Sequence, residues 1–313
     1  MIKPLFSLTL AVTLGLSSVA AQPQEVDLTP ENIILTTRDG LELKGRYFPG
    51  RHERETIPVI ILHGWDERGS TYEALAKQLQ SEEYGGHAVF VPDLRGHGGS
   101  NRLADPKRNR VKELSADKLS KADLLAMIEY DLDTVKNFLM EKHNEGELNI
   151  DMLSVIGSEE GGVLAAHWAA HDWSWPPLAG TRQGQDVKGL VLLSPPQNVK
   201  GLSAREAVPL PGMKQDISVM VIVGRTGRRA ASHAKRLHGA LQVHRPQQWA
   251  SQQERQENQD LFLYEVDTSL QGSKLLGEKS LGVTNKIHQF LDWRLRRRAH
   301  QHPWEERNLP LGS

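Results

Sequence analysis

Apolar residues along the chain form two kinds of pattern. Some segments are short runs in which apolar residues are continuous or occupy every second position, and others are longer stretches with a period near 3.6 residues. The short runs predict β-strands at residues 33–37, 41–48, 57–62, 87–91, 152–156, 189–193, 219–223 and 261–266. The helical spacing predicts helices at residues 70–79, 121–142, 161–170 and 282–298. Strands that alternate with helices in this way favour an α/β fold with a mostly parallel central sheet and helices on both faces.

The first two predicted strands are joined by Arg38, Asp39 and Gly40. Asp-Gly is a hairpin signal, because both central residues of the favoured two-residue turn need positive φ. We therefore expect the sheet to begin with an antiparallel N-terminal hairpin.

The N-terminal residues have the pattern of a signal peptide. Lys3 supplies a positive charge, and the mostly apolar run at residues 5–16 is too short to span a bilayer. Small residues at Val19-Ala20-Ala21 predict cleavage after Ala21. The chain is then exported to the periplasm or secreted, and the open alternative is an uncleaved membrane anchor.

The predicted signal peptide, residues 1–21, precedes one large domain at residues 22–298, and the rest, residues 299–313, is expected to be an irregular C-terminal tail. No second apolar stretch is long enough to cross a membrane, so no transmembrane segment is expected after signal cleavage.

Composition narrows the possible chemistry. The 38 Lys and Arg residues nearly balance the 39 Asp and Glu residues, so no nucleic-acid partner is expected. The chain has no cysteine, which excludes disulfides, zinc-thiolate sites and thiol nucleophiles. A basic cluster lies between Arg294 and Arg298 and is interpreted as a solvated helix end, with an anionic partner as the alternative.

Three motifs follow predicted strands in order along the chain. They are Leu62-His63-Gly64-Trp65, Pro92-Asp93-Leu94-Arg95-Gly96-His97-Gly98-Gly99-Ser100 and Val155-Ile156-Gly157-Ser158-Glu159-Glu160-Gly161-Gly162. Together they resemble the α/β-hydrolase superfamily, closest in style to its esterase, lipase and serine-peptidase-like members. The resemblance covers residues 32–298 and implies the α/β-hydrolase fold. The segment between the strands at residues 189–193 and 219–223 is too short for a large lid, so we expect a minimal one.

The resemblance also implies roles for individual residues. The backbone at Trp65 and Glu160 would correspond to the oxyanion hole. The loops that support the site would include His63, Gly64, Asp93, Arg95 and His97.

The third motif corresponds to the nucleophile elbow, a sharp strand-to-helix turn with glycine two residues before and two after the nucleophile. Gly157 and Gly161 place Glu159 at the nucleophile position, and Ser158 falls one residue early. Some superfamily members use aspartate there, but glutamate shifts the reacting oxygen by a methylene. Ser158 stays open as a displaced nucleophile.

The other two triad positions also carry unexpected residues. The acid position after the strand at residues 219–223 holds Gly227, and Lys274 stands about where the histidine would be. Three substituted positions favour a degenerate triad, in which Glu159 and Lys274 are hypothesised to form an ion pair. A rearranged pair of Ser158 with Lys274 as base is the alternative.

Two functions follow from this pattern. The first is a catalytically inactive α/β-hydrolase-fold protein that binds an unknown small-molecule ligand or protein partner. The alternative is an active serine-type hydrolase of carboxylic esters or amides with a displaced triad. No metal site is expected, because His63, His97 and His167 lack ligand-like spacing. No cofactor is expected either, because the glycine-rich stretches lack the ending of a phosphate loop.

Overall fold

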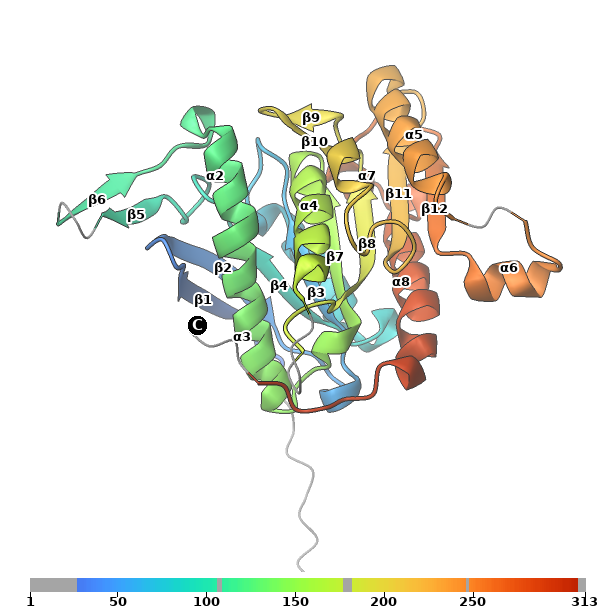
Figure 1. Ribbon diagram of the computed structural model, residues 1–313, viewed down its shortest axis with the longest axis horizontal. Coiled ribbons are helices and arrows are strands. Elements are labelled where there is room, and N and C mark those ends of the chain that lie inside the picture. Colours follow the sequence, from blue (N-terminus) through green and yellow to red (C-terminus); the bar gives the residue numbers. More distant parts are fainter. Residues whose placement is uncertain (1–26, 106–108, 177–181, 246–247, 309–313) are drawn as a thin grey trace, which may run out of the picture.

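The computed structural model describes residues 27–105, 109–176, 182–245 and 248–308, so the predicted signal peptide lies outside the described residues. The central sheet has the order β1-β2-β4-β3-β7-β8-β11-β12 (Figure 1). Its strands are β1 (Glu31–Thr36), β2 (Glu42–Phe48), β3 (Pro58–Leu62), β4 (Ala88–Pro92), β7 (Leu153–Ser158), β8 (Val187–Leu193), β11 (Ser218–Gly224) and β12 (Leu261–Val266). The eight predicted strands are thus confirmed to within two residues at each end.

Strand direction follows the predicted pattern. Strand β2 pairs antiparallel with both β1 and β4, and the pairs from β4 through β12 are parallel. Parallel strands place all their carboxyl ends at one edge of the sheet, which is where this architecture positions a site.

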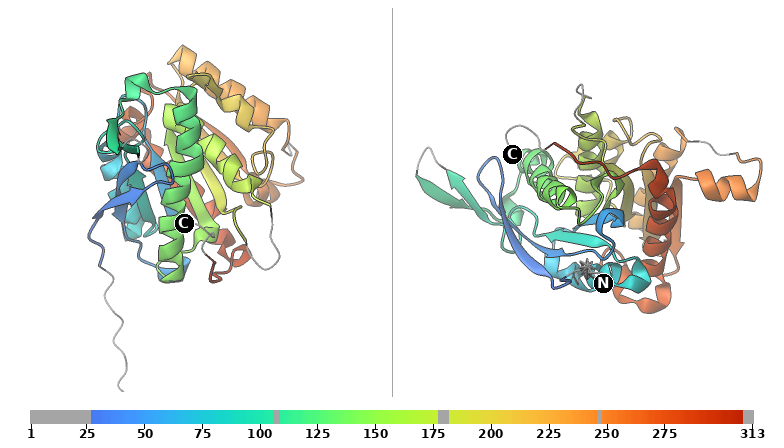
Figure 2. Two further views of the ribbon diagram at one scale, coloured as in Figure 1. Left: turned by 60° about the vertical axis from the view of Figure 1, so that its left-hand side comes forward. Right: turned by 90° about the horizontal axis from the view of Figure 1, so that it is seen from below.

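Helices cover both faces of the sheet, as predicted. They are α1 (Glu73–Gln80), α2 (Lys121–Ala126), α3 (Leu132–Asn144), α4 (Glu160–Ser174), α5 (Arg228–Gln242), α6 (Gln252–Asn258), α7 (Lys274–Gly277) and α8 (Val283–Arg294). Apolar residues of α3, α4 and α5 form one core with the sheet, and those of α1 and α8 form a second core on the opposite face (Figures 1 and 2). The predicted helix at residues 121–142 is α2 and α3 joined through a π-helical turn at Met127–Asp131.

Two small hairpins were not predicted. Strands β5 (Arg102–Asp105) and β6 (Arg110–Glu113) project from the body between β4 and α2, and β9 (Asn198–Val199) and β10 (Leu202–Ser203) lie between β8 and β11 (Figure 1). Their sequences lack the apolar runs that reveal buried strands, since β6 is exposed along its whole length. The short β9–β10 hairpin agrees with a minimal lid. None of the helices formed by the described residues has the length and apolar character needed to cross a bilayer.

The end of the described chain is docked against the body. After a 3₁₀ helix at Arg296–Gln301, residues 302–308 run beneath the sheet toward α3 (Figure 2). Asn149 donates to the His302 carbonyl at 2.9 Å, and the Trp304 indole donates to the Leu148 carbonyl at 3.2 Å. We call residues 302–308 the C-terminal strap.

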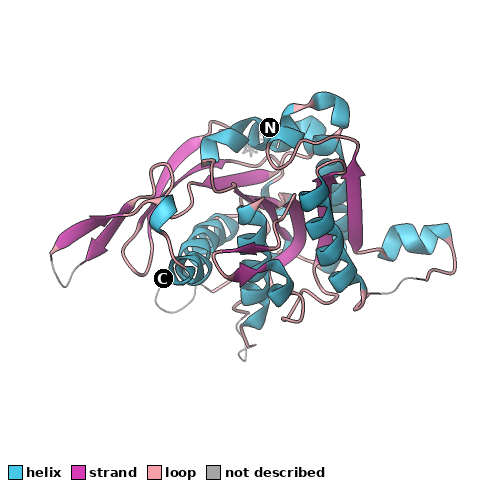
Figure 3. Ribbon diagram, turned by 90° about the horizontal axis from the view of Figure 1, so that it is seen from above, coloured by secondary structure: helices cyan, strands magenta, loops and turns pink. Residues whose placement is uncertain are grey.

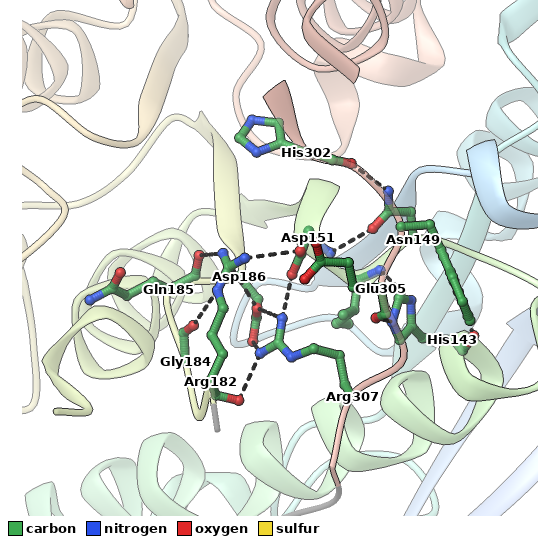
Figure 4. Close-up of polar contacts among 12 residues, drawn as sticks. His143, Asn149, Asp151, Arg182, Gly184, Gln185, Asp186, His302, Glu305 and Arg307 are labelled. Carbon is green, nitrogen blue, oxygen red and sulfur yellow. Dashed lines mark hydrogen bonds and ion pairs between the residues drawn. The ribbon is translucent and has the colours of Figure 1, made fainter. Parts of the chain in front are cut away.

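Arg307 anchors the C-terminal strap in a buried group of charges (Figure 4). Its guanidinium pairs with Asp186 at 2.9 Å and also with Asp151. These two carboxylates precede β8 and β7, so the strap ties together the amino ends of adjacent strands. The ion pairs of the group join three carboxylates and three cations, namely Asp151, Asp172, Asp186, Lys136, Arg182 and Arg307. The charges therefore balance only when the strap is docked.

Replacing Arg307 by Met should destabilise the fold by about 3–5 kcal/mol, because it leaves the buried group with one cation fewer than it has carboxylates. Arg297→Met is the matched control, since Arg297 forms an exposed pair with Asp292 and should cost less than about 1 kcal/mol. Urea unfolding of both variants measures the difference. Equal midpoints for the two would show that the strap does not contribute to stability.

Candidate active site

Glu159 is the single residue that links strand β7 to helix α4, and it forms the bend between them. This residue has φ 47° and ψ −117°, a backbone conformation that residues with a side chain rarely adopt. A strained turn of this kind between a strand and a helix is the geometry of a nucleophile elbow. Ser158 is the last residue of β7 and is fully buried, and its hydroxyl lies beside the Tyr72 hydroxyl. The structure therefore places Glu159 at the tip of the bend and Ser158 beneath it.

Glycines make this bend possible because backbone segments approach closely on both sides of it. A Cβ at Gly157 would lie 2.5 Å from the Gly161 carbonyl oxygen. A Cβ at Gly161 would lie 2.5 Å from the carbonyl oxygen of His63, in the loop after β3. Helix α4 thus starts in direct contact with the segment that carries the first motif.

The Glu159 side chain fills the space between two neighbouring loops. A Cβ at Gly64 would lie 3.0 Å from Glu159 Oε2, and a Cβ at Gly272 would lie 2.8 Å from Glu159 Cδ. Gly272 follows β12 and has a φ of +55°, which L side chains rarely adopt. A side chain at position 272 would therefore require the Glu159 side chain to move, in addition to adopting this φ. Gly272, in the loop after β12, is thus the residue that packs against the Glu159 side chain.

Acidic residues dominate the electrostatics of the bend. Burial raises the pKa of the Glu159 carboxyl, and the charges of Glu160 and Glu67 raise it further. The positive charge of Lys274 acts in the opposite direction without cancelling these effects. Lys274 is exposed at the start of α7, and its amine forms no ion pair with Glu159 in the structure. The hypothesised Glu159–Lys274 ion pair is therefore not formed.

A carboxylate binds one of the two backbone groups that the resemblance assigned to an oxyanion hole. The Trp65 backbone N–H donates to Glu160 Oε2 at 2.9 Å, so one of the two expected donors is already engaged. Glu160 is the first residue of α4, where the helix dipole favours a negative charge.

Neutral groups occupy the region of the acid position. Gly227 precedes α5, and a Cβ there would lie 2.3 Å from Gln271 Nε2. The Gln271 amide donates to the Gly224 carbonyl at 3.0 Å and accepts from the Ser194 hydroxyl at 2.7 Å. Ser194 Oγ also accepts from the Gly272 N–H at 3.1 Å, so this network positions the glycine that faces Glu159.

The patterns in the sequence did not identify Gln271, Ser194 and Gly272 as residues of the site. Glu67 was not predicted either. Its carboxylate accepts from the Gly64 N–H at 2.9 Å, from the Tyr72 hydroxyl at 2.6 Å and from the Ser273 hydroxyl. For Gln271 and Gly272 the signal in the sequence was a Gln-Gly pair in the loop after the last strand, and for Ser194 it was a serine directly after the strand predicted at residues 189–193.

Both histidines near the bend are engaged with the backbone. His63 Nδ1 donates to the Gly64 carbonyl at 2.7 Å, and its Nε2 accepts from the Leu94 N–H at 2.9 Å. His97 has a carbonyl oxygen beside each ring nitrogen, that of Arg95 at 3.0 Å and that of Trp65 at 2.8 Å. Neither ring keeps a nitrogen free to act as a base.

Asp93 and Arg95 brace the loop after β4 from below. Asp93 accepts from the backbone N–H groups of Gly69 and Gly99, each at 2.8 Å. The Arg95 guanidinium is fully buried and pairs with Asp131 at 2.6 Å and Asp39 at 2.7 Å. Asp39 belongs to the N-terminal hairpin turn and Asp131 to the π-helical turn, so one side chain joins three distant segments.

The described residues contain no group of three or more His, Asp or Glu side chains placed to hold a metal ion. The strained elbow thus carries the Glu159 carboxylate. The Glu160 carboxylate lies next to it in sequence, and Gly64 and Gly272 pack against the Glu159 side chain.

The sheet order and the strained bend between β7 and α4 are those of an α/β-hydrolase-type fold. The sequence matches the family model of the α/β hydrolase fold over residues 57–304, and the chain belongs to this family. Among curated protein sequences, none matches this chain.

Solved structures show the same architecture. An esterase from Pyrococcus furiosus is similar with a TM-score of 0.58 and 14% identity, over 85% of this chain and 92% of that one. An α/β hydrolase from Penicillium sp. has a TM-score of 0.54 and 14% identity, over 86% and 99% of the two chains. An esterase from Pyrobaculum calidifontis has a TM-score of 0.53 and 14% identity, over 84% of each chain. At these identities the likeness shows the fold alone.

Gly161→Ala should destabilise the protein by about 3 kcal/mol, because its Cβ meets backbone atoms that cannot move aside. Gly239→Ala in α5 is the matched control, since a Cβ there meets nothing within 4 Å and should stabilise the helix by about 0.5–1 kcal/mol. Thermal or urea unfolding measures both changes. A Gly161→Ala protein as stable as wild type would contradict the close approach of α4 to the β3 loop.

Stability should fall as the pH decreases from 7 toward 4. Burial lowers the pKa of His63 to about 4, below its ordinary value of 6.5, so in this range the unfolded chain binds a proton that the folded protein does not. The effect is on the order of 3 kcal/mol for this group. Urea unfolding at several pH values in this range measures the free energy of unfolding as a function of pH. This free energy should change less steeply with pH in His63→Asn than in wild type, and an equal pH dependence in the two proteins would refute the assignment. The buried His87, whose pKa burial lowers to about 3, contributes to the slope that remains.

Proposed function

We propose that this chain is a catalytically inactive member of the α/β hydrolase fold family that binds a ligand or a partner outside the cytoplasm. One observation carries the proposal. The elbow presents the Glu159 carboxylate to a glycine, Gly272, where a hydrolase needs a base.

Covalent hydrolysis needs an activated nucleophile and a base that activates it or the attacking water. Glu159 has no hydrogen-bond partner for its carboxylate among the described side chains, and both nearby histidines are bonded to the backbone. Ser158 would need such a base too, and its buried hydroxyl lies beside the Tyr72 hydroxyl, which is not a base. Neither candidate has the second group that turnover requires.

The Glu160 carboxylate adds an electrostatic obstacle. Acyl transfer gains much of its acceleration from N–H donors aimed at a developing negative charge. Here the Trp65 N–H already donates to a carboxylate at 2.9 Å, which repels an incoming oxyanion. The expected location outside the cytoplasm is supported by the composition of residues 1–21.

A fluorophosphonate probe should not label the protein, because no serine is activated at the elbow. A serine esterase labelled in parallel serves as the positive control. Hydrolysis of p-nitrophenyl acetate should be no faster with wild type than with Glu159→Gln, which keeps the shape of the side chain and removes its charge.

Two results would establish turnover instead. Labelling that Ser158→Ala abolishes would identify a displaced serine triad. Ester hydrolysis that Glu159→Gln abolishes would identify the carboxylate as a nucleophile.

A further inference from the structure

Helix α6 projects from the edge of the molecule beside β12, the last strand of the sheet (Figure 3). None of its residues is buried, so it adds nothing to either core. A helix of this length without an apolar face is not stable by itself. Some other interaction must hold it in place.

Both ends of α6 are fixed by polar contacts. The Ser251 hydroxyl accepts from the Glu254 N–H at 3.0 Å and caps the N-terminus. At the C-terminus, Arg294 from α8 donates to the carbonyls of Glu257 and Gln259, each at 3.0 Å. The Arg294 side chain is 3% exposed, so this part of the basic cluster is buried under α6 rather than solvated as expected.

The helix forms a wall of two cavities, of about 410 Å³ and 620 Å³. Trp249, Arg255 and Gln259 line both of them. The larger cavity also contacts Phe262 of β12 and Trp293 of α8. The anchoring of α6 therefore creates concave surface and no core.

The larger cavity combines aromatic rings with free amides. Trp249, Phe262 and Trp293 are all partly exposed there, and α6 adds the exposed amides of Gln252 and Gln256. Within the part of the chain that the structure describes, neither of these amides nor either indole N–H has a hydrogen-bond partner. The amides and the indole N–H groups are therefore available to a ligand. The guanidinium groups of Arg297 and Arg294 lie 5.8 Å from the centres of the Trp293 and Phe262 rings, respectively.

The cations around this cavity are mostly engaged. Arg294 is bonded to α6 carbonyls, Arg298 pairs with Asp260 at 2.9 Å, and Arg297 pairs with Asp292 at 2.9 Å. Only Arg255 on α6 lines the cavity with a charge, and its Nε donates to Gln259. A neutral ligand fits this surface better than a polyanion such as a nucleic acid.

We propose that the larger cavity binds a neutral oligosaccharide. Aromatic rings pack against the C–H faces of sugar rings, while amides both donate to and accept from hydroxyls. This inference rests on α6 and its surroundings and does not depend on the elbow being inactive. Sugar binding and probe labelling can therefore fail separately.

The test uses the wild-type protein on an array of neutral hexose, pentose and N-acetylhexosamine oligosaccharides, followed by titration of tryptophan fluorescence with the best binder. Trp293→Ala should weaken binding at least about tenfold, as expected for an aromatic contact at the centre of a site. Gln256→Ala, an exposed change that should not affect folding, should weaken it severalfold. Trp175→Ala is the control, because this exposed tryptophan contacts His171 outside the cavity.

Three outcomes would overturn the proposal. They are no binding to any neutral oligosaccharide on the array, binding that Trp293→Ala and Gln256→Ala leave unchanged, and equal weakening by Trp175→Ala. Tighter binding of a single-stranded oligo-dT probe than of any sugar would show that the cavity prefers a polyanion.

Discussion

The start of α4 lies so close to the loop after β3 that backbone atoms touch across the bend. A Cβ at Gly161 would lie 2.5 Å from the His63 carbonyl oxygen, and the bend itself stores strain in Glu159 at φ 47°. This contact fixes the direction of the Glu159 side chain and the place of Trp65. The same close contact brings the start of α4 next to the loop after β3, where the Trp65 N–H donates to the Glu160 carboxylate.

Polar networks hold the two ends of the sheet. At the carboxyl ends, Arg95 joins the first hairpin, the loop after β4 and the π-helical turn. At the amino ends, Arg307 of the C-terminal strap joins the starts of β7 and β8 (Figure 4). Buried ion pairs of this kind specify one arrangement of segments, because each charge is costly without its partner.

This chain keeps the backbone framework of a hydrolase, but the side chains next to the bend are not those that hydrolysis needs. The strained bend, its glycines and the braced loops are all present, whereas the groups beside the Glu159 carboxylate and Gly227 are a glycine, Gly272, and the Gln271 amide. Packing requires the bend, its glycines and the loops whether or not the protein turns over a substrate, whereas a base and an acid are required for catalysis alone. Our proposal of an inactive fold rests on this separation, and α6 adds concave surface at a site remote from the elbow.

The sequence by itself determined the strands, their direction and the position of Glu159 at the bend, because apolar periodicity and glycine spacing are local signals. Only the tertiary structure decided what faces Glu159. The order of residues after β12 suggested Lys274, yet the loop folds so that Gly272 packs against the carboxylate and Lys274 is exposed. The partners of Arg307 and Arg294 were equally hidden, because such contacts join residues far apart in the chain and leave no periodic trace in it.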